Sequence, residues 1–254
     1  MVDLKGNKLP GTKMGRSMNQ ILKQKVQINF SFEYNDWLNE TPFVLFHNYK
    51  NENFQDLINQ KSLVIINKWT LMQIAGEETI SVCNSILSNY SLENPAITTF
   101  TNNYLSLKLE SFLIISRSIL DISSTLVYLI CTQKKSIQSI NALRKKSDSP
   151  KWLKEYLSNQ LPYNPNIPFE ENKWLSLIVT DNNSPQSLRD FVTHRGIIDF
   201  SFNEIWDDEW DIVIKPRTGV DKYLISVKGV VKKIMNGINE FSLILTENLE
   251  NNVS

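Results

Sequence analysis

The chain has 254 residues with 27 basic and 27 acidic side chains, so its formal net charge is zero. A neutral chain offers no overall attraction to nucleic acid or to a membrane, and any such partner must be met by a local patch. Hydrophobic residues make up 41% of the chain, which excludes a disordered protein and allows one large domain or two small ones.

Cysteine usage and the N-terminal segment both bear on the cellular compartment. Cys83 and Cys131 are the only cysteines, too few for a disulfide framework and too far apart for a Cys-x-x-Cys metal site. The N-terminal segment is basic but has no apolar run, so it does not resemble a signal peptide. We therefore expect a cytoplasmic protein.

The first half of the chain predicts two helices. Alternating apolar residues at 26–32 give a weak strand signal, and helical periodicity then runs from about residue 53 to 90 and from about 96 to 132. The segment 111–131 is about long enough to span a bilayer. Arg117 and Asp121 in its middle instead favour a buried helix of a protein without membrane contact.

The second half predicts shorter elements and one long final helix. A basic, polar region covers 133–157, prolines mark a loop at 162–168, and a short helix is expected at 170–179. A further helix has Ser184 as its candidate N-cap, Pro185 in its first turn and Gly196 as its stop. Residues 211–226 resemble a hairpin around Pro-Arg-Thr-Gly.

The final helix shows a seam of apolar residues spaced 3, 4, 3 and 4 apart, which needs another helix from the same chain or from a second copy. The seam consists of Val231, Ile234, Ile238, Phe241 and Leu245. The predicted fold class is therefore all-α, a mostly helical bundle with a small β-hairpin near the C-terminus.

The helix after Ser184 carries one of the two histidines of the chain. At about 100° per residue, Leu188, Phe191 and Val192 form one apolar stripe. The polar residues occupy the opposite arc, with Arg189 and His194 at its edges, about 140° apart. Neighbours on a helix are three or four residues apart, so these two are poorly placed to meet within one helix.

Two interpretations of this polar arc are open. It can be a solvated face with a surface histidine. Alternatively, two copies can pack these faces about a two-fold axis, so that Arg189 of each approaches His194 of the other. Arginine recognises phosphate through two parallel hydrogen bonds, and histidine titrates near neutral pH. Such a pair suffices for metal-free RNA cleavage, in which the 2′-hydroxyl attacks its own phosphate.

The pattern Arg189-x-x-x-x-His194, with polar Asp190 directly after the arginine, resembles the R-x(4–6)-H signature of the HEPN superfamily (higher eukaryotes and prokaryotes nucleotide-binding domain). In that family the signature lies on a helix late in an all-helical domain, beside a long helix that often carries a charged residue. Residues 110–130, with Arg117 and Asp121, resemble that long helix.

The resemblance implies a metal-independent endoribonuclease that acts as a homodimer, of the kind found in toxin–antitoxin pairs and antiviral defence. It implies catalytic roles for Arg189 and His194 and an orienting role for Asp190, with no cofactor. Non-catalytic relatives bind RNA, nucleotide or a partner protein, which is the alternative function. Residues 95–254 would form the HEPN-like domain, and residues 1–94 a mostly helical extension of unknown role. Some relatives are silenced by modification of a tyrosine two residues after the histidine, but this chain has Gly196 there.

Other residues are candidates for supporting roles. Asp121 can hold Arg189 or His194 in place, or form only a structural ion pair with Arg117. Candidate RNA contacts are Lys134, Lys135, Arg144, Lys145 and Lys146, and the alternative is a solvated basic face. The acidic run 207–211 reads better as a turn into a strand than as a metal site, so we expect no metal. His47, Trp152 and Tyr156 read as packed residues, although the two aromatic residues could stack on bases.

Overall fold

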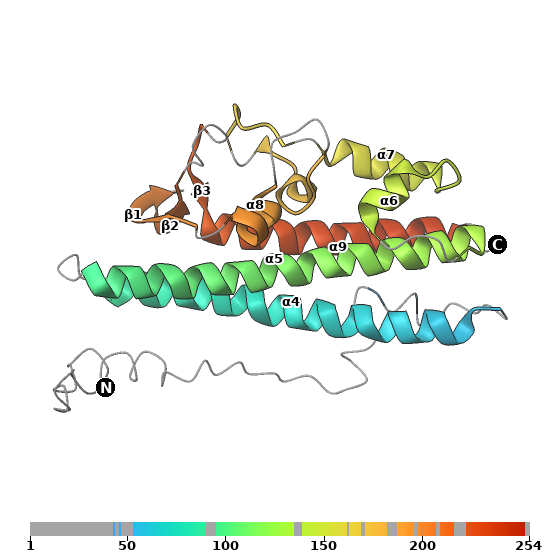
Figure 1. The fold of residues 1–254 in the computed structure, drawn as a ribbon, viewed down its shortest axis with the longest axis horizontal. Helices are drawn as coiled ribbons and strands as arrows, with labels where there is room; N and C mark the ends of the chain where they lie inside the picture. The colour runs from blue at the N-terminus through green and yellow to red at the C-terminus, as the bar shows by residue number, and fades with distance from the viewer. Residues whose placement is uncertain are drawn as a thin grey trace, which may run out of the picture. The chain divides into compact units, whose positions relative to one another are not determined.

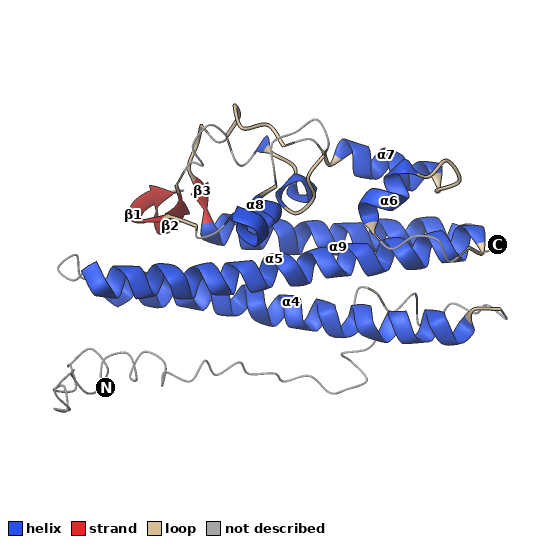
Figure 2. Cartoon of the chain, in the orientation of Figure 1, coloured by secondary structure: helices blue, strands red, loops and turns tan. Residues whose placement is uncertain are grey.

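The computed structural model describes Phe43, Phe46 and residues 53–89, 95–134, 139–161, 163–168, 171–181, 187–195, 198–206, 209–215 and 222–251. All of them belong to one compact unit, residues 32–254. Figures 1 and 2 show a mostly helical chain with a small sheet, which confirms the predicted fold class. The strand expected at 26–32 and His47 lie outside the described residues.

The elements follow one another along the chain as helices with one late group of strands. The long helices are α4 (Gln55–Asn89), α5 (Pro95–Thr132) and α9 (Val227–Asn251). The shorter helices are α6 (Ile140–Lys145), α7 (Lys151–Asn159), the 3-10 helix η2 (Trp174–Leu177) and α8 (Leu188–Arg195). The strands are β1 (Phe200–Trp206), β2 (Glu209–Ile214) and β3 (Ile225–Ser226).

The long helices α4 and α5 run antiparallel along each other, and α9 packs against both (Figure 1). Their facing side chains, such as Met72, Phe112 and Ile234, are fully buried. Because α4 precedes residue 95 and shares this core, the helical extension and the predicted domain are packed together. The division of the chain at residue 95 stays a prediction, and the role of residues 1–94 stays open.

Several hydroxyl groups of helix α5 bond to carbonyls of the preceding helical turn, although the buried hydroxyls of Ser123 and Ser124 have no partner among the described residues. Ser116 is fully buried and donates to the carbonyl of Phe112, and Thr125 donates to the carbonyl of Asp121. By length and composition, residues 99–132 could cross a membrane, but 61% of the most apolar 18-residue segment within them is buried inside the protein. A core helix of a bundle passes the same test.

The seam of α9 is covered by the chain itself. Ile234, Ile238 and Phe241 are fully buried, with α4, α5 and η2 as the packing partners of α9. Trp174 of η2 lies tilted against Phe241, with ring centroids 6.5 Å apart. The seam predicted packing against a helix of the same chain or of a second copy, and the structure shows the first of these. The seam is no longer an argument for a second copy.

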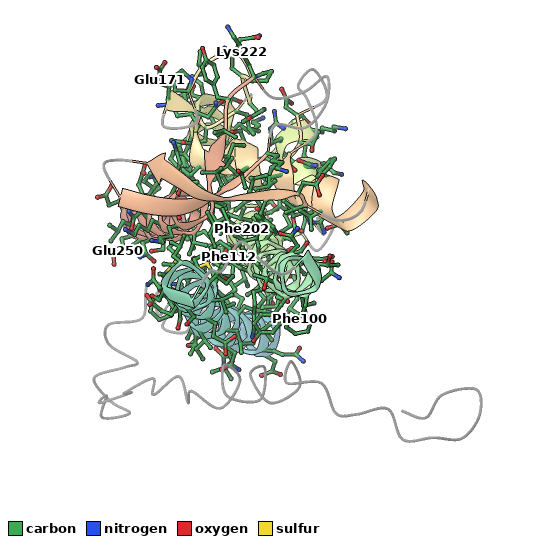
Figure 3. The ribbon with its side chains drawn as sticks, turned by 90° about the vertical axis from the view of Figure 1, so that its left-hand side faces the viewer. Phe100, Phe112, Glu171, Phe202, Lys222 and Glu250 are labelled. Atoms are coloured by element: carbon green, nitrogen blue, oxygen red, sulfur yellow. The ribbon has the colours of Figure 1, made fainter. Side chains whose placement is uncertain are left out.

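The strands form one antiparallel sheet in the order β1-β2-β3. In the view along the long helices, the sheet lies over one side of the bundle (Figure 3). Strand β2 contacts α4 and α9. The β2-β3 pair is the predicted hairpin, with Val213 opposite Ser226. Strand β1 was not predicted, because the alternation that begins with Phe200 and Phe202 is interrupted by the irregularity between Ser201 and Glu204.

Two predicted helix boundaries were wrong. The helix expected at 170–179 is only the 3-10 turn Trp174–Leu177, because Asn172 bonds backwards to the backbone of Asn164 and holds the chain in a loop. The helix expected to start near Ser184 and Pro185 begins at Leu188. Ser184, Pro185 and Gly196 lie outside the described residues.

Candidate functional site

Helix α8 begins at a serine cap. Ser187 is buried, and its hydroxyl accepts a hydrogen bond from the amide of Asp190 at 3.2 Å. An N-cap serine satisfies one of the free amides of the first helical turn. The spacing Ser187-x-x-Asp190 has the form of a capping box, a signal in the sequence that marks the true start of the helix.

The apolar stripe predicted for α8 is confirmed. Leu188 and Val192 are buried, Phe191 is partly buried against the core, and Thr193 on the other side is exposed. Arg189 and Asp190 are not solvated as a surface face would be, because only 24% and 20% of their side chains are exposed. The cover comes from the chain itself, since α8 packs against α5.

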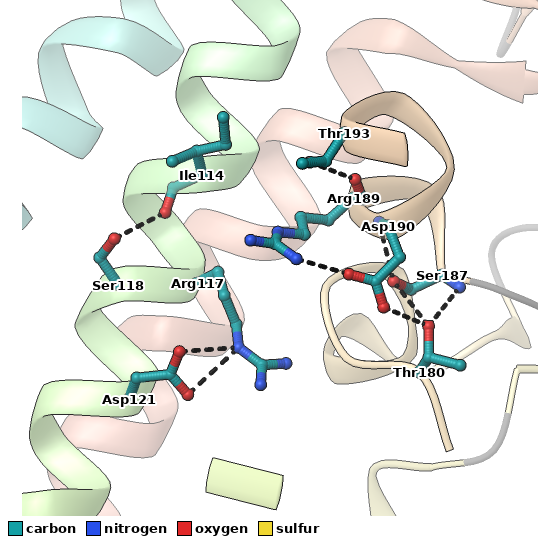
Figure 4. A network of polar contacts seen from close by, with 9 residues as sticks. All are labelled: Ile114, Arg117, Ser118, Asp121, Thr180, Ser187, Arg189, Asp190 and Thr193. Carbon is teal, nitrogen blue, oxygen red and sulfur yellow. Dashed lines mark hydrogen bonds and ion pairs between the residues drawn. The ribbon is translucent and has the colours of Figure 1, made fainter. Parts of the chain in front are cut away.

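Asp190 is the centre of a polar network that joins α8 to the preceding loop (Figure 4). Its carboxylate accepts a hydrogen bond from the hydroxyl of Thr180 at 2.5 Å and from the guanidinium of Arg189 at 2.6 Å. The Thr180 oxygen also accepts the amide of Ser187 at 2.9 Å. Thr180 is thus inserted into the capping box, bridging the amide of its serine and the carboxylate of its aspartate.

The charge of Asp190 follows from these contacts. Partial burial acts to raise the pKa of this carboxyl, but the bonds from Thr180 and Arg189 and the positive charges of Arg189 and Arg117 outweigh it. The net result is a pKa below the ordinary aspartate value, so Asp190 is ionised at neutral pH. An ionised Asp190 fixes the direction of the Arg189 guanidinium.

Arg117 and Asp121 form the predicted i, i+4 pair on α5. The Nε of Arg117 donates to both carboxylate oxygens of Asp121, at 3.2 Å and 3.1 Å. The same carboxylate accepts the amide of Ile140 at 2.9 Å and so ties α5 to the start of α6. These contacts match the structural interpretation of Asp121; within the described part of the chain it makes no bond to Arg189.

Arg117 is the α5 residue that faces the motif. Figure 4 shows the side chains of Arg117 and Arg189 extending from their two helices into the space between them. The charge of Arg117 contributes to the lowered pKa of Asp190. Of the two supporting residues expected on α5, the arginine rather than the aspartate therefore interacts electrostatically with α8.

His194 lies in α8, five residues after Arg189, but its side chain is outside what the structure describes. Its separation from Arg189 around the helix therefore stays as the sequence predicts it. The shared Arg189/His194 site between two copies stays a prediction as well.

Some of the basic residues expected to contact RNA form ion pairs with aspartates, and others are exposed without an ion pair to a described residue. Arg144, with 21% of its side chain exposed, bonds to Asp181 at 2.9 Å. Lys134 pairs with Asp148 at 2.7 Å. Lys145 and Lys146 are exposed at the end of α6. Lys135 lies outside the described residues. Because Asp181 adjoins Thr180, the pair with Arg144 anchors the loop that holds Asp190.

The remaining candidates have structural contacts. Tyr156 stacks on Phe241, with ring centroids 5.7 Å apart, as expected for a packed residue. Asp211 is buried in β2, where it accepts the hydroxyl of Ser226, the residue whose oxygen also caps the amide of Gly229 at the start of α9. Among the residues that the structure describes, no group of three or more His, Cys, Asp or Glu could hold a metal ion.

Sequence reasoning missed Thr180 and Ser187. The Ser-x-x-Asp spacing was visible in the sequence and could have identified Ser187. Thr180 lies in a loop ten residues before Asp190, where no periodicity operates, so only the folded chain brings the two together.

Comparison with known proteins adds no assignment. No protein-family model, curated protein or solved structure matches the chain. The functional argument therefore rests on the residues of the site and on the resemblance of the Arg189–His194 pattern.

Proposed function

We propose that the protein is a metal-independent endoribonuclease that acts as a homodimer, a cytoplasmic toxin or antiviral-defence effector controlled by a partner protein. Arg189 binds the scissile phosphate, His194 of the second copy transfers the proton, and Asp190 orients Arg189. The observation that carries the proposal is the fixed direction of Arg189, because Asp190 bonds to it and is itself held by Thr180. A preorganised cation stabilises developing charge without reorganising during the reaction.

The proposed reaction is an internal transesterification. The 2′-oxygen forms a bond to phosphorus while the bond from phosphorus to the 5′-oxygen breaks. His194 takes the proton from the 2′-hydroxyl, and water gives a proton to the departing 5′-oxygen, leaving a 2′,3′-cyclic phosphate and a 5′-hydroxyl. Arg189 stabilises the charge that builds on the phosphate oxygens.

An exposed apolar stripe on α5 supports a second copy beside this site. Phe100, Leu107 and Ile114 are seven residues apart and have 41%, 57% and 38% of their surface exposed. A seven-residue repeat of apolar side chains is a pattern of helix pairing, and this stripe is exposed, so a helix of a second copy is available to it as a partner. Ile114 lies next to Arg117 on α5, so the stripe ends at the motif (Figure 4).

The second candidate is a non-catalytic helical module that binds RNA, nucleotide or a partner protein. The buried part of Arg189 favours it. The Nε of this residue is buried and bonds to no described residue, and its terminal nitrogen is already paired with Asp190. An arginine so placed, with its one bond made to the neighbouring residue of α8, can serve a purely structural role in that helix.

Replacement of the two motif residues tests the proposal. Purified Arg189→Ala and His194→Ala proteins should each cut RNA about 10²–10⁴-fold more slowly than the wild type, in the presence of EDTA. Thr193→Ala is the matched control, since Thr193 is exposed on the same helix. Folded variants that cut as fast as the wild type would refute the assignment. A wild type that binds RNA without cutting it would favour the binding module.

A further inference from the structure

Two arginines from different helices extend into the region between α5 and α8, beside the motif, and the charge of Arg117 acts on Asp190, the partner of Arg189. Arg117 comes from α5 and Arg189 from α8, and both side chains extend between the helices (Figure 4). Only 11% of the Arg117 side chain and 24% of the Arg189 side chain are exposed. Two partly buried guanidinium groups that share a space repel one another. The carboxylates of Asp121 and Asp190 each offset one of these charges, which allows both guanidinium groups to lie in this region.

Each arginine uses only part of its hydrogen-bonding capacity. Arg117 donates through Nε to Asp121, and its terminal nitrogens bond to no described residue. Arg189 donates through one terminal nitrogen to Asp190, and its Nε is buried without a partner in the described part of the chain. A guanidinium offers five donors, so several remain for an anion placed between the two side chains.

We propose that Arg117 and Arg189 of one chain together bind a single phosphoryl group. If the proposed nuclease function holds, on which this assignment rests, the phosphoryl group is a phosphodiester of RNA. A free nucleotide would present the same phosphoryl chemistry. Arginine suits this task because its planar fork matches two phosphate oxygens at once.

The carboxylates keep the empty site in shape. Asp121 and Asp190 each hold one guanidinium through its own bond, so both arginines keep their direction before a ligand arrives. The two ion pairs, Arg117–Asp121 and Arg189–Asp190, are together neutral. A phosphate would bind to the N–H donors of the two arginines that the aspartates do not use. Arg117 would then contact the substrate directly, whereas Asp121 would act only through Arg117.

Equilibrium binding to three probes tests the proposal. The probes are inorganic phosphate, AMP and a decamer of 2′-O-methyl RNA, which lacks the attacking hydroxyl and cannot be cut. Arg117→Lys and Arg189→Lys keep the charge but lose the fork, and each should weaken binding about tenfold or more. Lys108→Arg is the matched control, because 24% of the Lys108 side chain is exposed and it also pairs with a carboxylate, that of Glu78.

The outcomes separate the sources and the two proposals. Tighter binding of the RNA than of AMP identifies RNA as the source, and equal or tighter binding of AMP identifies a nucleotide. Wild-type affinity in folded Arg117→Lys would overturn the shared site while leaving the nuclease proposal intact. Dependence on both arginines without any RNA cleavage by the wild type would keep the site and remove the nuclease.

A second measurement covers the case in which Arg117→Lys does not fold. In the wild type, the Nε–H resonances of Arg117 and Arg189 should both shift in an NMR titration with inorganic phosphate, with one dissociation constant. A shift of Arg189 alone would contradict the proposal.

Discussion

The hydroxyl of Thr180 lies 2.5 Å from the carboxylate of Asp190, to which it donates a hydrogen bond. The same oxygen accepts the amide of Ser187. A single side chain in a loop therefore sets both the start of α8 and the direction of the carboxylate that holds Arg189. The loop in turn is anchored to α6 by the ion pair between Asp181 and Arg144.

Thr180→Val should raise the pKa of Asp190, because the nearly isosteric change removes a hydrogen bond to the ionised carboxylate. In the wild type this pKa lies below the ordinary value of 3.8, so the ionised form stabilises the fold at higher pH, and this stability is lost as the pH falls through the folded-state pKa. The variant should lose about 1–3 kcal/mol at pH 7 and less in strong acid. Urea unfolding at pH 7 and pH 2 measures both values.

Thr180→Ser is the control, since it keeps the hydroxyl. The NMR shift of the Asp190 carboxyl carbon, followed from pH 7 to pH 2, reports the pKa directly. An unchanged Asp190 pKa in the valine variant would show that the carboxylate does not depend on Thr180.

Leu107→Lys should weaken self-association. Leu107 is 57% exposed at the middle of the α5 stripe, and a symmetric interface would bury it twice. Loss of that burial should raise the dimer dissociation constant by about two orders of magnitude or more. Sedimentation at micromolar concentration should show a dimer for the wild type and a monomer for the variant.

Leu243→Lys is the matched control, because Leu243 on α9 is also exposed, at 64%. If the wild type is a monomer at this concentration, the stripe has another function. If Leu107→Lys and Leu243→Lys raise the dimer dissociation constant equally, the α5 stripe is likewise not the specific interface.

Arg144→Ala should act on stability rather than on RNA binding. It leaves Asp181 without its partner at 23% exposure, which should cost about 1–3 kcal/mol in urea unfolding. Lys145→Ala and Lys146→Ala should change stability by less than about 0.5 kcal/mol. If these exposed lysines contact phosphates, each change should also reduce the number of counterions released on RNA binding, measured from its salt dependence, by about one. If Arg144→Ala instead weakened RNA binding and left stability unchanged, Arg144 would be an RNA contact.

Gly237→Ala should destabilise the protein by about 1–3 kcal/mol, because a Cβ at this position would lie 2.2 Å from the ring of Trp174. Gly76→Ala should cost less, since its nearest contact is the flexible end of Met235, at 2.7 Å. Thermal unfolding of the two helical variants compares them. Equal melting temperatures would show that η2 shifts easily and that the contact with Trp174 is not a tight constraint.

The sequence predicted the parts of the fold that depend on helical periodicity. The seam of α9, from Val231 to Leu245, and the stripe of Leu188 and Val192 on α8 are buried as expected, because the geometry of a helix decides which residues share a face. The same reasoning could not identify what covers each face. The α9 seam meets α4 and α5, although a second copy was equally compatible with the pattern.

Contacts between distant segments were beyond reach of the sequence. Arg144 lies in a run of basic residues, and nothing in that run shows that it pairs with Asp181, 37 residues later. Thr180 and Arg117 likewise acquire their relation to Asp190 only when the loop and α5 pack against α8. The candidate site depends mainly on such side-chain pairings, and only the tertiary structure determines them.

Complementation between two inactive variants tests the central claim most directly. Arg189→Ala and His194→Ala chains are coexpressed with different tags, and RNA cleavage by the purified mixture is measured in EDTA. If Arg189 of one chain works with His194 of the other, half of randomly assembled dimers contain one intact site, and the mixture should reach about a quarter of the wild-type rate. The products should end in 2′,3′-cyclic phosphate. A mixture no more active than the single variants, beside an active wild type and with mixed dimers present, would contradict the shared site.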